Sequence, residues 1–161
     1  MGQLRTAWAA VPLALLMACG SGAEEGDVLA CTMIGSSAGI GVTVEQPLAA
    51  QADTVRLETC WGEECVAAEA PLYPGTTVVD EGCDGDEPEA ACSASSTPDG
   101  TMQGFVDVAE LPADEVEVTA IVQHRDGTEA HRAVVRTTAA PTYPNGKHCD
   151  PGANQAQITL P

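Results

Sequence analysis

Aromatic side chains are scarce in this sequence. Its 161 residues include two Trp, two Tyr and one Phe. Because aromatic rings dominate the packing of many proteins, their scarcity predicts a core built from Val, Ile, Leu and Ala. It also argues against a sugar-binding sandwich that stacks several rings on its ligand. Trp61, near a predicted hairpin tip, is the candidate contact for a protein partner.

Basic residues are also scarce. The chain has 6 Lys and Arg residues against 24 Asp and Glu, and its formal net charge is −18. A field of this sign repels phosphates and anionic lipid headgroups. Nucleic acid is therefore not an expected partner, whereas cations and basic proteins remain open.

A sustained helical period is missing after the N-terminal segment, and apolar residues alternate in short runs instead. Gly, Pro and Asp turns separate these runs, and a longer loop ending near Gly100 interrupts them. The pattern predicts an all-β, immunoglobulin-like β-sandwich of about seven to eight strands, with a small β-barrel as the alternative. The expected strands are residues 39–47, 53–60, 65–70, 76–80, 103–111, 114–124, 129–138 and 155–160.

The N-terminus has the features of an export signal. Arg5 precedes an apolar run, residues 7–17, that is too short to span a bilayer permanently. The run ends in "LMAC", which resembles the bacterial lipobox and predicts a lipid on the thiol of Cys19, with palmitate among the acyl chains. We therefore expect a signal peptide (1–18), a lipidated Cys19 with a flexible acidic tether (19–30) and a sandwich domain (31–161), anchored on the extracellular face of the cell membrane.

Setting Cys19 aside leaves six cysteines, an even number typical of a disulfide framework in an exported domain. Six cysteines allow 15 pairings, and spacing ranks them. Cys60 and Cys65 flank "WGEE", where a four-residue hairpin loop would place them opposite each other, and Cys83 and Cys92 bracket the acidic stretch "DGDEPEAA". The remaining pair is Cys31–Cys149. A metal site is the competing interpretation, but the cysteines lack CxxC spacing and closely spaced histidines.

The stretch "RDGT" predicts a β-hairpin, with Asp126-Gly127 in a type I′ turn. This turn would pair Val118 with Val135, Ala120 with Ala133 and Val122 with His131 on an inward face. On the outward face Glu117 would meet Arg136, an opposite-charge pair that favours the same register. A slip by one residue would bury arginines.

Residues 35–39 match G-x-S-x-G, but the strand-like run that follows is not the helix of a nucleophile elbow. His124, His131 and Glu129 could approach one another near the end of the hairpin and bind Zn²⁺ or Cu²⁺, although a fourth ligand is not evident. Asp84 and Asp86 belong to an acidic run that could bind Ca²⁺ weakly, without the spacing of a calcium-binding loop. Because these metal candidates are weak, we expect no cofactor. We also expect no enzymatic activity, because the sequence shows no Ser-His-Asp context, no paired carboxylates in an identifiable cleft and no phosphate-binding loop.

Four stretches together, "LMAC", "ACTMIGSSAGIGVTVE", "VRLETCWGEEC" and "TYPNGKHCDPGANQAQITL", resemble a group of uncharacterised actinobacterial surface lipoproteins. The resemblance covers nearly all of the chain after the signal but consists of cysteine and turn positions. It implies an envelope location and a shared sandwich fold, with no catalytic residues. The expected function is that of a noncatalytic binding or envelope-associated module, whose ligand would be an envelope protein or a small molecule, and the alternative is a metal-binding envelope protein.

Overall fold

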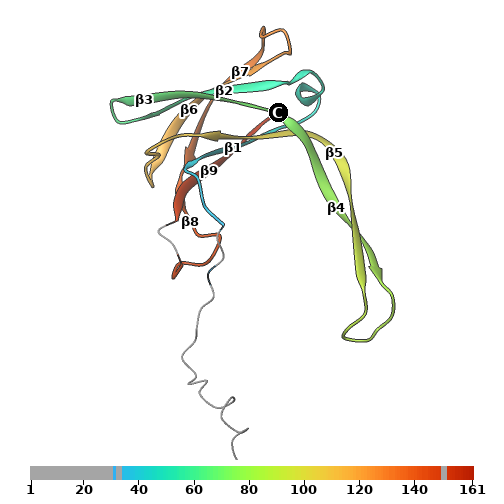
Figure 1. Ribbon diagram of the computed structural model, residues 1–161. Helices are drawn as coiled ribbons and strands as arrows, with labels where there is room; N and C mark the ends of the chain where they lie inside the picture. Colours follow the sequence, from blue (N-terminus) through green and yellow to red (C-terminus); the bar gives the residue numbers. More distant parts are fainter. Residues whose placement is uncertain (1–30, 32–33, 150–151) are drawn as a thin grey trace, which may run out of the picture. The chain divides into compact units, whose positions relative to one another are not determined.

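The computed structural model describes residues 31, 34–149 and 152–161. The predicted signal peptide, Cys19 and the tether lie outside the described residues. The described chain forms nine strands and one short 3-10 helix (Figure 1). They are β1 (Gly39–Val44), the 3-10 helix (Leu48–Gln51), β2 (Thr54–Trp61), β3 (Glu64–Pro71), β4 (Tyr73–Cys83), β5 (Cys92–Asp107), β6 (Glu115–Gln123), β7 (Glu129–Thr138), β8 (Ala140–Thr142) and β9 (Ala153–Leu160).

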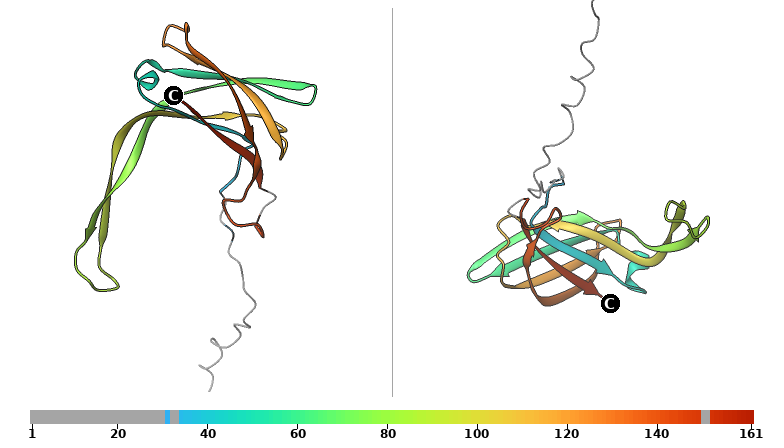
Figure 2. Two further views of the ribbon diagram at one scale, coloured as in Figure 1. Left: turned by 180° about the vertical axis from the view of Figure 1, so that it is seen from behind. Right: turned by 90° about the horizontal axis from the view of Figure 1, so that it is seen from below.

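The strands form two sheets, one with the order β4-β5-β1-β9-β8 and one with the order β3-β2-β6-β7. They pack face to face as a β-sandwich, which confirms the predicted immunoglobulin-like class (Figure 2). The barrel alternative is wrong, because the two sheets have separate hydrogen-bond ladders. The last strand, β9, lies parallel beside β1. No helix in the described part of the chain is long and apolar enough to cross a membrane.

The core between the sheets is aliphatic, as the shortage of aromatic residues predicts. Alternate residues of β1, β2, β6 and β9 point inward, and every buried hydrophobic side chain among the described residues is Val, Leu, Ile or Ala. The fully covered members include Ile40, Val44, Val55, Leu57, Val118, Val122 and Leu160. Strand alternation in the sequence therefore locates the core correctly.

The β6–β7 hairpin has the predicted register but a different turn. Val118 lies opposite Val135, Ala120 opposite Ala133 and Val122 opposite His131, and an Arg136 nitrogen lies 3.1 Å from a Glu117 oxygen. The type I′ prediction is wrong. A type I′ turn needs positive φ at both central residues, and here Gly127 has φ +81° whereas Asp126 does not share the positive region.

The β2–β3 hairpin is tighter than predicted. Cys60 lies opposite Cys65, and Trp61 still pairs with Glu64. The loop is therefore two residues long rather than four. Gly62 supplies the positive φ, +59°, that its first position requires.

The largest error concerns the region between residues 76 and 102. The sequence predicts a short strand at 76–80 and a loop to Gly100, but β4 has 11 residues and β5 has 16. Ser, Thr, Asp and Pro favour loops in sequence patterns, yet here they pair across a two-stranded antiparallel ribbon. The short β8, at the edge of the five-stranded sheet, was also not predicted.

Candidate functional site

The outer parts of β4 and β5 form a ribbon that projects from the sandwich (Figures 1 and 2). We define the ribbon as residues 76–98, with its turn at 84–91. In its two strands every residue except Ser95 is exposed. Val78, for example, keeps 75% of its surface accessible. The ribbon therefore adds almost nothing to the core, and solvent reaches both of its faces.

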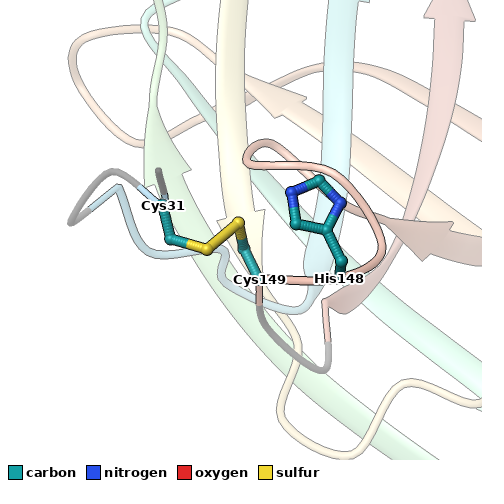
Figure 3. A group of neighbouring side chains, drawn as sticks. All are labelled: Cys31, His148 and Cys149. Atoms are coloured by element: carbon teal, nitrogen blue, oxygen red, sulfur yellow. A yellow bond between two sulfur atoms is a disulfide. The ribbon is translucent and has the colours of Figure 1, made fainter. Parts of the chain in front are cut away.

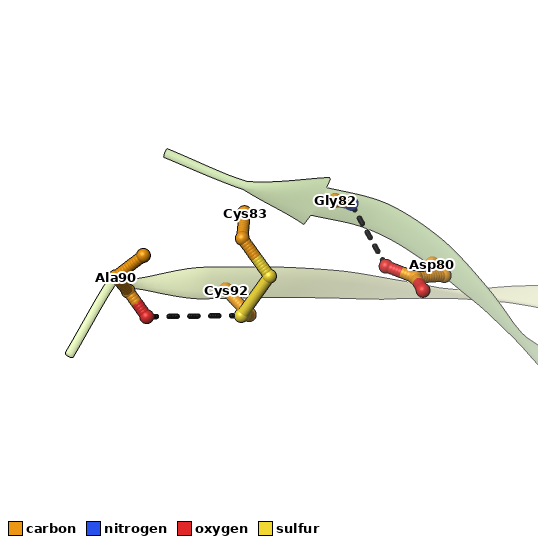
Figure 4. Close-up of a disulfide and its surroundings, with 5 residues drawn as sticks. All are labelled: Asp80, Gly82, Cys83, Ala90 and Cys92. Carbon is orange, nitrogen blue, oxygen red and sulfur yellow. Dashed lines mark hydrogen bonds between the residues drawn. A yellow bond between two sulfur atoms is a disulfide. The ribbon is translucent and has the colours of Figure 1, made fainter. Parts of the chain in front are cut away.

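A disulfide closes the far end of the ribbon. Cys83 and Cys92 lie directly opposite each other and are bonded (Figure 4). Beside them the backbone N–H of Gly82 donates to Asp80 Oδ1 at 2.8 Å, and the N–H of Asp84 donates to the carbonyl of Ala91 at 2.9 Å. Two-stranded ribbons without a core are marginally stable, so this covalent link keeps the two strands paired.

A local irregularity in β5 lies where the ribbon leaves the sandwich. Asp99, Gly100 and Thr101 lie between the residues that pair with Thr76 and Pro74, so three residues of β5 face Gly75 alone. Asp99 Oδ1 accepts hydrogen bonds from the Thr101 N–H at 2.9 Å and the Thr101 hydroxyl at 2.7 Å. Gly100, with φ +86°, provides the left-handed conformation at this point.

The two Asp-Gly-Thr tripeptides of the chain, residues 99–101 and 126–128, have the same hydrogen bonds. In each, the Thr hydroxyl and backbone N–H donate to the Asp carboxylate. The Thr101 hydroxyl and backbone N–H lower the pKa of Asp99, because both bonds favour the ionised carboxylate. At the β6–β7 turn the pKa of Asp126 is lowered in the same way by the hydroxyl and N–H of Thr128. The repeated Asp-Gly-Thr tripeptide is therefore the sequence signal that could have predicted the turn-like irregularity at residues 99–101.

The ribbon carries charge of one sign. The sequence has no Lys, Arg or His between Arg56 and His124. The carboxylates of the ribbon and its turn are Asp80, Glu81, Asp84, Asp86, Glu87 and Glu89, and Asp99 follows at its base. Their charges are therefore not balanced by any cationic side chain of the same strand pair.

Trp61 lies beside an open hollow of about 350 Å³ at one end of the four-stranded sheet. The lining residues are Cys60, Trp61, Gly62, Glu115, Val116, Glu117 and Arg136. Trp61 packs against the hydrophobic core and is only partly exposed. Part of the indole is therefore used in packing against the core, and a partner would contact only its exposed part.

The predicted transition-metal residues have other neighbours. His124 Nδ1 lies 3.2 Å from the carbonyl oxygen of Gln51, and a Glu129 oxygen lies 2.6 Å from an Arg132 nitrogen. The Arg132 hydrogen bond lowers the pKa of Glu129. His131 lies opposite Val122. In the described part of the chain, these three residues do not form a group with ligand atoms within 4.8 Å of one another.

Two other clusters do have ligand atoms this close, but both contain bonded cysteines. Figure 3 shows His148 beside the Cys31–Cys149 disulfide, and Glu58 lies beside the Cys60–Cys65 disulfide. A metal binds a thiolate, and in both clusters the two sulfurs are bonded to each other instead.

The three disulfides are the same pairs that the cysteine spacing ranks first. Asp84 and Asp86 are exposed in the ribbon turn.

The G-x-S-x-G segment, residues 35–39, leads directly into β1. A nucleophile elbow requires a sharp turn from a strand into a helix, and this segment lacks that context. The carbonyl of Ser37 accepts a hydrogen bond from Gln155 Nε2 at 2.9 Å, which ties the segment to β9. The segment therefore connects the N-terminal part of the chain to the first strand.

The ribbon is thus the described feature that is exposed, uniformly charged and not needed for the core. Compared with protein-family models, with curated proteins and with solved structures, the chain matches none at a significant level.

Proposed function

We propose that this chain is a lipid-anchored extracellular binding protein without catalytic activity, and that the ribbon is its binding element. The observation that carries the proposal is the exposure of nearly every residue in the two strands of the ribbon. A strand pair that buries no core does not stabilise the sandwich. Surface segments of this kind, held by a rigid scaffold, commonly carry recognition.

Anchoring depends on Cys19. Three disulfides agree with an oxidising location outside the cytoplasm, and the sequence before Cys19 resembles a lipobox. The substitution Cys19→Ala should release the protein into the medium or leave its signal peptide uncleaved, because the thiol that would carry the lipid is lost. Fractionation of cells followed by mass spectrometry of the N-terminus measures both outcomes. A cleaved Cys19→Ala chain that stays firmly in the membrane would contradict lipidation.

Binding by the ribbon is tested by removing it. A variant in which an Asn-Gly turn joins Thr77 to Thr97 should keep the thermal stability of the sandwich, because the core residues are unchanged and both residues that close the turn keep their backbone N–H. It should lose the chemical cross-links that the full-length chain forms to envelope components on intact cells. Trp61→Ala is the matched comparison, since Trp61 is the other candidate contact. Loss of the cross-links in Trp61→Ala but not in the ribbon-free variant would move the binding site to the hollow.

A further inference from the structure

We propose that the free edge of β4 between Thr76 and Asp80 binds a cationic, extended segment of another protein as an added strand. This inference rests on the proposed function and names the chemistry of the partner. β4 lies at the end of the five-stranded sheet, and β5 is its only partner among the described strands. An edge strand of this kind presents unpaired N–H and C=O groups that another strand can engage.

Pro98 determines which backbone groups of β4 face outward. Pro98 lies opposite Thr76 and has no N–H, so this pair belongs to the non-hydrogen-bonded type in the antiparallel ladder. The two types of pair alternate, and the register continues without a shift to Asp80 opposite Ala94. The N–H and C=O groups of Thr76, Val78 and Asp80 therefore point to the free edge.

The opposite edge of the ribbon is less suited to an added strand. There Pro98 removes one donor, and the irregular residues Asp99 to Thr101 follow it directly. From Met102 onward, β1 already pairs with β5. β4 has no proline between Gly75 and Cys83, so its edge keeps its donors.

The negative charge of the ribbon indicates which kind of strand would bind at the free edge of β4. Asp80 and Glu81 lie on β4 itself, more carboxylates follow in the turn, and no cationic side chain lies between Arg56 and His124. A second copy of this chain would bring carboxylates against carboxylates, which is unfavourable. A strand rich in Lys or Arg would complement them. Val78, 75% exposed, offers an apolar contact on the same face as Thr76 and Asp80.

The test uses the purified full-length chain in zwitterionic detergent and fluorescent heptapeptides. The probe is KTKVKTK, with ETEVETE as the charge-reversed peptide and a third peptide that carries KTKVKTK with alternate backbone nitrogens methylated. Fluorescence anisotropy should show binding of KTKVKTK that weakens with salt. The methylated peptide should bind about tenfold more weakly, because it cannot donate the ladder hydrogen bonds.

Two proline variants locate the edge. Val78→Pro removes an outward N–H of β4 and should weaken KTKVKTK binding by about tenfold. Ser96→Pro makes the matching change on the other strand and should change the affinity by less than about twofold. Equal binding of the methylated and unmethylated peptides, absence of KTKVKTK binding, or binding of ETEVETE would each overturn the proposal. The peptide comparison needs no variant to fold.

The two proposals fail in different ways. If Val78→Pro keeps the envelope cross-links that the ribbon-free variant loses, binding by the ribbon stands and strand addition is wrong. If the ribbon-free variant keeps every cross-link, the ribbon is not the binding element. Loss of the cross-links in both variants, with Ser96→Pro unaffected, supports both proposals.

Discussion

A chain with Cys31→Ala and Cys149→Ala should lose about 5 kcal/mol of unfolding free energy, the loop-entropy value for a long closed loop. The two cysteines are 118 positions apart and join the segment before β1 to the segment before β9. Without the link the unfolded chain gains the conformations that the loop excluded. The melting temperature should fall by roughly 15 °C for a domain of this size, as measured by calorimetry.

The matched control is the double variant Cys60→Ala and Cys65→Ala. These cysteines are 5 positions apart, so the same relation predicts a loss of about 2 kcal/mol. Both variants remove one disulfide and two sulfur atoms, and they differ mainly in loop length. A loss in the short-loop variant equal to that in the long-loop variant would show that chain entropy is not the main contribution.

Leu57→Ala should destabilise the sandwich by roughly 3 kcal/mol. Leu57 is fully buried in β2, between Ala68 of β3 and Ala120 of β6 in the sheet. Its two sheet neighbours are small, so they cannot fill the space that the lost methyl groups leave. Urea unfolding followed by circular dichroism measures the change.

Thr59→Val is the control for this prediction, because it changes the next inward position of the same strand while conserving side-chain volume. Thr59 is fully buried, and its hydroxyl has no hydrogen-bond partner among the described residues. Replacing an unpaired buried hydroxyl by a methyl group should leave stability unchanged or raise it by about 1 kcal/mol. A large loss in Thr59→Val would mean that the hydroxyl makes a contribution that the described contacts do not show.

Local patterns in the sequence are sufficient for much of the fold. The alternation of Val116, Val118, Ala120 and Val122 identifies an inward strand face, because successive side chains point to opposite faces. The Glu117 and Arg136 pair selects one register of the β6–β7 hairpin, because a slip would bury arginines. The cysteine spacing likewise ranks first the three disulfides that the structure contains.

The candidate site was harder to predict. The sequence predicts a loop at residues 92–100, because Ser, Thr, Asp and Pro are common in loops. Residues 92–98 form a strand because each pairs with a residue of β4, and a sequence pattern does not show such pairing. The histidines illustrate the same limit. His124 faces the carbonyl of Gln51, a residue 73 positions away, rather than the other predicted ligands.

The sequence by itself determined the all-β class, the aliphatic core and the strongly acidic surface, since each depends on residue type and on spacing within a few positions. Only the tertiary structure decided that β1 lies between β5 and β9, and that β4 and β5 continue beyond the sandwich as a ribbon with one free edge. These features depend on contacts between distant segments. Their stability comes from pairing, packing and covalent closure that the folded chain alone brings together.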